Sequence, residues 1–201
     1  MPNLHKMTLH CIATWLGKSI DDLHPIDAKI SMFHSAIAKF HAPSDPSGTH
    51  RMRHEHICST PSWRGHKPHR DCAFVSKNER EPGMRGMDVV RVILFFSFEY
   101  GCIYYPCALV ERFKMVKSDP VTGMWVVQPD IVCSRHHQSV LHLDTFYQGA
   151  HLMPVYGKEK LPVDFHYSNS LDAFWAFYVN KYIDHHANEI AFWSVVVAWA
   201  K

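Results

Sequence analysis

Histidine and cysteine side chains that suit zinc gather in residues 50–72. Three of them alternate along the chain, so a β-strand would place all three on one face, and three more follow at three-residue steps. Zinc accepts imidazole and thiolate ligands in tetrahedral sets, although no C-x-x-C pair is present. We expect no cofactor, and zinc is the alternative. Its candidate ligands would be His54, His56, Cys58, His66, His69 and Cys72.

The same segment is basic, and this property favours a different ligand. Between positions 50 and 70, five arginines and lysines stand against a single acidic residue, Glu55. Basic side chains interleaved with an aromatic residue suit phosphate contacts combined with base stacking. A solvated loop beside a charged edge strand would have the same composition, because charges discourage pairing at a sheet edge. The residues that would bind nucleic acid are Arg51, Arg53, Trp63, Arg64, Lys67 and Arg70.

Catalytic signatures give no enzyme class. The chain has no G-x-x-x-x-G-K-[ST], G-x-G-x-x-G, G-x-S-x-G or H-E-x-x-H sequence. A polar cluster of Asp184, His185, His186 and Glu189 suits metal ligation or acid–base work, or a polar turn packed on a sheet. We expect a non-catalytic protein. The alternatives are a zinc protein or metal-dependent enzyme that uses the cluster at 54–72, and a protein-interaction module or decayed fragment without activity.

Composition sets wider limits. The chain has 201 residues, 47% of them apolar, and a net charge of +2, so it can bury one core and needs no second domain. The six cysteines form no C-x-x-C pair, and the first residues lack the apolar run of a signal peptide. We therefore expect reduced thiols, a nuclear or cytoplasmic protein and no membrane association.

The elements that would position these residues centre on residues 84–128. Residues 89–98 and 103–110 are rich in β-branched and aromatic side chains, which favours two long strands joined at Gly101, and residues 124–127 form a shorter third strand. Further strands are predicted at 71–75, 139–144 and 150–155, with loops at 117–123 and 129–138. Consecutive antiparallel strands of this kind form a meander that curls to hide its edges.

Helical spacing appears near both ends. Apolar residues at 4–16 recur with helical period, and Gly17 is placed to end that helix. Ser170 is an N-cap candidate for a second helix, whose apolar face would hold Leu171, Phe174, Trp175 and Tyr178. Residues 29–40 fit a helix better than a strand by spacing alone.

The predicted fold class is α+β and β-dominated, with a twisted antiparallel sheet or small partial barrel, an N-terminal helix and a C-terminal helical segment. We expect residues 1–201 to form a single domain. Within it, residues 4–17 would be the N-terminal helix, 29–157 the β-rich core, and 158–201 the helical segment and tail.

Several long strings, in order, resemble the C-terminal region of fungal Plavaka-type transposon proteins, which are related to the CACTA and KDZ cut-and-paste elements. The strings are FHSAIAKFHAPSDPSG, TPSWRG, DCAFV, MRGMDVVRVILFFSF, YYPCALVERF, TGMWVVQPD, VLHLDTFYQGAHLMPVYG and SLDAFWAFYVNKYIDHHANEIAF. The strings lie between residues 33 and 192, and the resemblance as a whole runs from about Leu4 to Phe192. The tail after Phe192 falls outside the pattern.

The resemblance implies an accessory role. The carboxylate triad of such transposases lies upstream in the family, so no residue of this chain inherits a catalytic role. The family pattern also implies a strand, not a helix, at residues 29–40, and we adopt the strand. The partners it suggests are DNA and other transposon or host proteins, and the oligomeric state is open.

Overall fold

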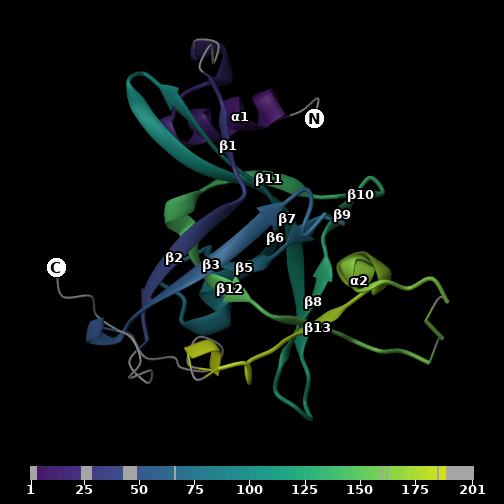
Figure 1. Ribbon diagram of the computed structural model, residues 1–201. Coiled ribbons are helices and arrows are strands. Elements are labelled where there is room, and N and C mark those ends of the chain that lie inside the picture. Colours follow the sequence, from purple (N-terminus) through teal and green to yellow (C-terminus); the bar gives the residue numbers. More distant parts are fainter. Residues whose placement is uncertain are drawn as a thin grey trace.

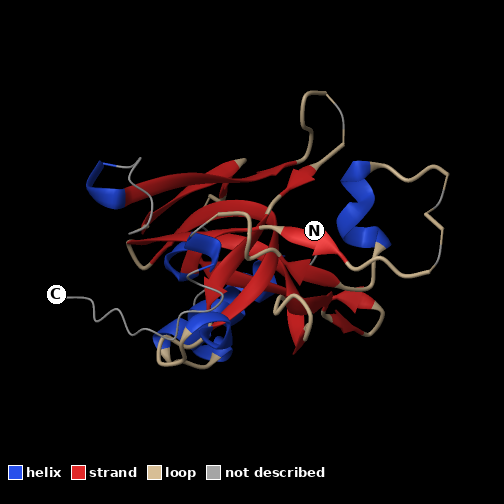
Figure 2. Cartoon of the chain, turned by 90° about the horizontal axis from the view of Figure 1, so that it is seen from below, coloured by secondary structure: helices blue, strands red, loops and turns tan. Residues whose placement is uncertain are grey.

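The computed structural model describes residues 4–23, 29–42, 49–65, 67–158, 160–161, 163–184 and 186–188. Figure 2 shows a body made of strands with the helices at its periphery. Within the described ranges, no helix combines the length and apolar character needed to cross a membrane. The helices are α1 (Leu4–Leu16), η1 (Ile20–Asp22), η2 (Thr49–Arg51), η3 (Gly83–Gly86), η4 (Leu143–Thr145), η5 (Tyr167–Asn169) and α2 (Ser170–Ala173).

The strands form one large antiparallel sheet and two small ones. The large sheet has the order β12-β5-β6-β7-β8-β14-β13, with β1 paired to β6 and β11 paired to β7, and it is nearly closed. The predicted β-dominated α+β class is confirmed. The strands are β1 (Ser31–Phe33), β2 (Ser35–His41), β3 (Met52–Thr60), β4 (His69–Arg70), β5 (Cys72–Ser76), β6 (Met87–Tyr100), β7 (Ile103–Ser118), β8 (Trp125–Pro129), β9 (Ile131–Val132), β10 (Arg135–His136), β11 (Gln138–His142), β12 (Phe146–Ala150), β13 (Leu152–Pro154) and β14 (Phe177–Val179).

The predicted central meander is present as β6, β7 and β8. Gly101 and Cys102 both take positive φ, at 58° and 61°, which gives the tight turn a twist that matches the two strands it joins. A register shift between Val92 and Leu94 puts two residues of β6 opposite one of β7, so the buried positions change parity along β6. As a result, one long strand contributes side chains to three separate apolar clusters.

These clusters hold the layers together. The first fills the curve of the sheet beneath β2 and β3 and includes Ile57 and Phe95. Helix α1 lies beside β11 at one end of the large sheet (Figure 1). The second cluster lies under this helix, whose Ile12 is fully buried and whose Trp15 stacks on Tyr105 with ring centroids 5.9 Å apart. The third lies between the other end of the sheet and α2, with Phe177 at its centre.

The N-terminal helix ends as predicted. Gly17 has φ 63°, and the amide of Lys18 donates to the carbonyl of Ala13 at 2.9 Å, so the chain closes the last turn of α1 and leaves it. On its buried side, the Cys11 thiol donates to the carbonyl of Val140 on β11 at 3.1 Å.

The segment 29–40 forms strands β1 and β2. The family pattern implied a strand here, whereas the spacing of its apolar residues favoured a helix. β1 pairs with β6, and β2 pairs with β3 along its whole length. The alternation of β2 places Ala36, Ala38 and Phe40 toward the large sheet.

The predicted C-terminal helix is wrong beyond its first turn. α2 covers only Ser170–Ala173, and the chain then extends into β14, which pairs with β8 and β13. Phe177 and Val179 are buried and Tyr178 between them is half-buried, so the side chains follow a period of two. Two further features were not predicted. One is strand β12, and the other is the short β9–β10 hairpin, which lies inside the predicted loop at 129–138.

Candidate functional site

The β2–β3 hairpin presents one side to solvent, which we call the hairpin face. Its inner side packs against β12 and β6, so alternate residues point outward. Cross-strand pairing sets Lys39 beside His54 and Ile37 beside His56. The hairpin face consists of Ser35, Ile37, Lys39 and His41 on β2 and Met52, His54, His56 and Cys58 on β3.

The two acidic residues near this face are both engaged by other groups of the chain. Glu55 points inward, where it accepts a hydrogen bond from the amide of Gly149 on β12 at 2.8 Å. Asp71 accepts from the amide of Cys58 at 2.7 Å and pairs with His69 at 2.9 Å. Within the described parts of residues 29–71 these are the two acidic residues. Glu55 lies on the inner side, whereas Asp71 lies opposite Cys58 at the edge of the hairpin face and is paired with His69.

The connection from β3 to β4 extends the positive surface. Trp63 is 43% exposed, the guanidinium carbon of Arg64 lies 5.8 Å from its ring centroid, and the ring of His69 lies at 5.1 Å. The amide of Trp63 donates to the carbonyl of Lys67 at 3.2 Å, which closes the turn. We call the set of Trp63, Arg64 and Lys67 the basic turn.

The structure divides the six nucleic-acid candidates. Arg51 and the three residues of the basic turn are exposed. Arg53 lies on the inner side of β3 with Glu55, and its guanidinium is 3.8 Å from the carboxylate of Asp184. Arg70 faces the same way, because its partner across the ladder is the buried Ser59. The structure therefore places Arg53 and Arg70 on the inner side of β3 and β4, apart from the other four candidates.

Sequence reasoning missed two members of the positive surface. Lys39 and His41 lie some ten residues or more before the basic segment and join it only through pairing of β2 with β3. The available signal was the alternation of residues 35–41, which competed with a helical spacing of the same residues.

The five described metal candidates are spread over two layers, and His66 lies outside the described residues. Three of the five share the hairpin face, His69 is engaged by Asp71, and Cys72 is buried in the core on β5. Burial raises the pKa of the Cys72 thiol to about 12, which disfavours the thiolate that zinc needs. In the part of the chain that the structure describes, no three His, Cys, Asp or Glu side chains form a group that could hold a metal ion. Zinc binding stays the alternative hypothesis, and the absence of a cofactor stays the prediction.

The C-terminal polar cluster packs on the hairpin. The ring of His186 stacks on Phe40 at 4.8 Å and on Tyr147 at 5.8 Å, and the Asp184 carboxylate accepts from the amide of Ala187 at 2.6 Å. His185 and Glu189 lie outside the described residues. The described members thus cap a turn and cover the edge of the core.

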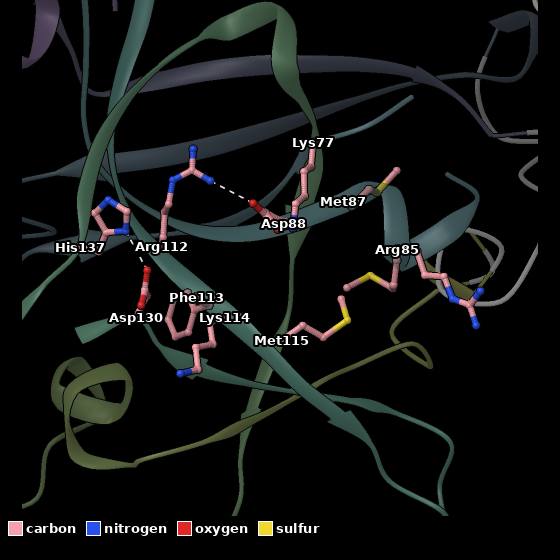
Figure 3. A pocket seen from close by; sticks show the side chains of 11 residues that line it. Lys77, Arg85, Met87, Asp88, Arg112, Phe113, Lys114, Met115, Asp130 and His137 are labelled. Atoms are coloured by element: carbon pink, nitrogen blue, oxygen red, sulfur yellow. Dashed lines mark hydrogen bonds and ion pairs between the residues drawn. The ribbon is translucent and has the colours of Figure 1, made fainter. Parts of the chain in front are cut away.

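A separate pocket opens where β6 and β7 part. The ladder between them ends at the pair Val90–Arg112, after which β6 stays with β5 and β7 pairs with β8. The pocket has a volume of about 430 Å³. Its lining combines apolar and charged side chains (Figure 3): Lys77, Met84, Arg85, Met87, Asp88, Arg112, Phe113, Lys114, Met115, Asp130 and His137.

Two carboxylates organise the charged side of this pocket. Asp88 accepts from Arg112 at 2.9 Å and lies 3.5 Å from the ammonium of Lys77. Asp130 lies 2.7 Å from Nδ1 of His137. No family model, curated protein or solved structure matches this chain, so its function is inferred from its own residues and geometry.

Proposed function

We propose that this chain is a non-catalytic domain that binds nucleic acid through the hairpin face and the basic turn. It would serve as an accessory domain of a transposon-derived protein, in the nucleus or the cytoplasm. The observation that carries the proposal is the distribution of charge: Lys39 and three histidines face outward on the hairpin face and Arg64 and Lys67 are exposed beside it, while Glu55 is bound inside by the Gly149 amide and Asp71 is paired with His69.

The shape of the surface suits a polyanion. A two-stranded β-ribbon fits the major groove of B-form DNA, and outward lysine and arginine side chains release counterions when they meet phosphates. Trp63 supports a second contribution, since a half-exposed ring next to Arg64 offers a plane for an unpaired base. Phosphate contacts of this kind position a nucleic acid without reading its sequence.

Fluorescence anisotropy with a labelled generic duplex and a labelled single strand tests the proposal. The test variant changes four exposed cations to glutamine: Lys39 of the hairpin face, Arg64 and Lys67 of the basic turn, and Arg51, which directly precedes β3 at the end of the hairpin face. The control variant removes the same charge from exposed positions elsewhere: Lys6, Lys18, Arg80 and Lys158.

We expect the test variant to weaken binding roughly tenfold or more at low salt, and the control variant to weaken it far less. A Trp63→Ala variant should weaken single-strand binding by about 1–3 kcal/mol and duplex binding less, because only unpaired bases stack on the ring. Equal losses in the test and control variants would show non-specific charge attraction and overturn the assignment. Absence of binding at low salt would overturn the function itself.

A further inference from the structure

We propose that the pocket between β6 and β7 binds a small organic anion, with an apolar body against methionine side chains and a carboxylate or phosphate at the cationic rim. This site is distinct from the hairpin face in its elements and its residues. The proposal therefore stands or falls separately from nucleic-acid binding.

The pocket exists because the sheet forks. β6 and β7 are paired for most of their length, but each changes partner past the Val90–Arg112 pair. Met84 and Arg85 of η3 line the opening. Helix η3 packs closely on the preceding turn, where a Cβ on Gly86 would lie 2.2 Å from the carbonyl oxygen of Glu81. The volume of about 430 Å³ falls in the range typical of small-molecule sites.

The apolar side of the pocket is adaptable. Met84 and Phe113 are buried members of the core cluster at this end of the sheet, and Met87 and Met115 are half-buried against it. Methionine side chains are unbranched and polarizable, so they adjust to ligands of different outline and make good contacts with aromatic rings. An apolar body of about the size of one ring would cover the exposed parts of Met87 and Met115 from water.

The charged side favours an anion. Four lysines and arginines line the pocket against two aspartates, which leaves an excess of two positive charges before His137 is considered. Arg112 is held from two directions, because its Nε donates to Ser139 at 2.9 Å and its Nη1 donates to Asp88. Fixing the guanidinium in advance lowers the entropic cost of binding a ligand.

Free cationic capacity remains after these internal pairs. The pair of Lys77 with Asp88 is loose, because the two charged atoms are 3.5 Å apart and the Lys77 side chain is mostly exposed. Lys77 also shares the Asp88 carboxylate with Arg112 (Figure 3). Among the described residues, neither Arg85 nor Lys114 has an ion-pair partner within 4 Å. Figure 3 shows the head groups of Arg85 and Lys114 on opposite sides of the pocket. A carboxylate or phosphate at the rim would pair with one of them by charge-assisted hydrogen bonds.

Methyl NMR of the full chain with ¹³C-labelled methionine tests the site directly. Phenyl phosphate and benzoate supply both halves of the predicted ligand, whereas inorganic phosphate and phenol each supply one half. We expect saturable shifts of the Met84, Met87 and Met115 methyl signals with the two complete probes. Signals of Met7 and Met32, on α1 and β1, should stay in place and serve as internal controls.

Matched variants locate the anion. Lys77→Gln combined with Lys114→Gln should weaken phenyl phosphate binding about tenfold, since two charged partners are lost. Lys117→Gln, on the same strand but outside the pocket lining, should leave binding unchanged. The proposal is overturned by absence of saturable shifts, by equal binding of inorganic phosphate and phenyl phosphate, or by equal affinity of the double variant. A benzoate response without a phenyl phosphate response would assign the site to carboxylates, and the reverse would assign it to phosphates.

Discussion

Arg91 joins α2 to the large sheet, and its removal should be among the most damaging single changes in the chain. Its side chain is 10% exposed and binds Asp172 of α2 through Nη1 at 2.6 Å and Nη2 at 3.3 Å. The same Nη1 lies 3.8 Å from the carboxylate of Glu111, its partner across the β6–β7 ladder, which is 13% exposed. Arg91→Met keeps most of the apolar volume but leaves the Glu111 charge buried without its cation.

The two carboxylates contribute unequally to the expected loss. Asp172 is 51% exposed, so solvent screens its pair with Arg91 and the contribution is about 1 kcal/mol or less. Glu111 is largely buried, and leaving a buried charge unpaired costs about 3–5 kcal/mol in proteins. Gln138 would still donate a hydrogen bond to Glu111 at 3.2 Å, and this bond would partly compensate the unpaired charge. We therefore expect Arg91→Met to lower the free energy of unfolding by about 3 kcal/mol, the lower end of that range.

Urea unfolding followed by tryptophan fluorescence measures these differences. We expect Arg91→Met to lower the free energy of unfolding by about 3 kcal/mol with an unchanged m-value, and Asp172→Asn to lower it by about 1 kcal/mol or less. Adding Glu111→Gln to Arg91→Met should recover more than half of the loss, because the unpaired charge is removed. A loss for Arg91→Met no larger than that for Asp172→Asn, or no recovery in the double variant, would refute this account of the core.

Other predictions concern the backbone, the thiols and the metal. Gly86→Ala should cost about 1–3 kcal/mol or more in urea unfolding, because its Cβ would meet two backbone carbonyl oxygens at 2.2 and 2.6 Å, whereas Gly157→Ala, with open space around it, should cost far less. Burial raises the pKa of Cys72 and Cys107 to about 12, so both thiols stay protonated at pH 8. Mass spectrometry should find both unalkylated by iodoacetamide in the folded protein, while the exposed Cys102 reacts. Prompt alkylation of all three would contradict the burial of Cys72 and Cys107 in the core. Because the described His and Cys candidates are not gathered, untagged protein should contain far less than one equivalent of zinc by elemental analysis, and a full equivalent would restore the metal hypothesis.

Much of the architecture could be predicted because short stretches of the sequence determine it. The strands of the meander are dense in β-branched and aromatic side chains, and Gly101 stands where the turn needs positive φ. The N-terminal helix shows a helical period followed by Gly17 in the left-handed region. In these places the spacing, the residue types and the turn residue all agreed.

What the sequence did not reveal depends on contacts between distant segments. The helix predicted from Ser170 was overridden because Phe177 and Val179 fill a core built by β8 and β13, so a period of two replaced the helical spacing. Strand β12 contains a buried Gln148 and a glycine, which are poor strand signals, yet it pairs with β5. Tertiary pairing decided both cases.

The candidate site shows the same division. The sequence shows that the segment is basic, but it does not show which way each side chain points. That direction depends on which face of the strand packs against the core. Arg53 turned inward to Asp184, while Lys39 entered the positive surface from another strand. The pocket depends on the fork between β6 and β7, which has no local signature in the sequence.

The salt dependence of duplex binding tests the central claim most directly. Each phosphate contact contributes about −0.9 to the slope of log K against log salt, so the loss of Lys39, Arg51, Arg64 and Lys67 should make the slope shallower by about 3 to 4. Anisotropy titrations between about 50 and 200 mM salt measure this slope for the wild-type chain, the test variant and the charge-matched control. We predict a shallower slope in the test variant and a nearly unchanged slope in the control. Equal slopes for all three proteins would contradict the assignment of nucleic-acid binding to the hairpin face and the basic turn.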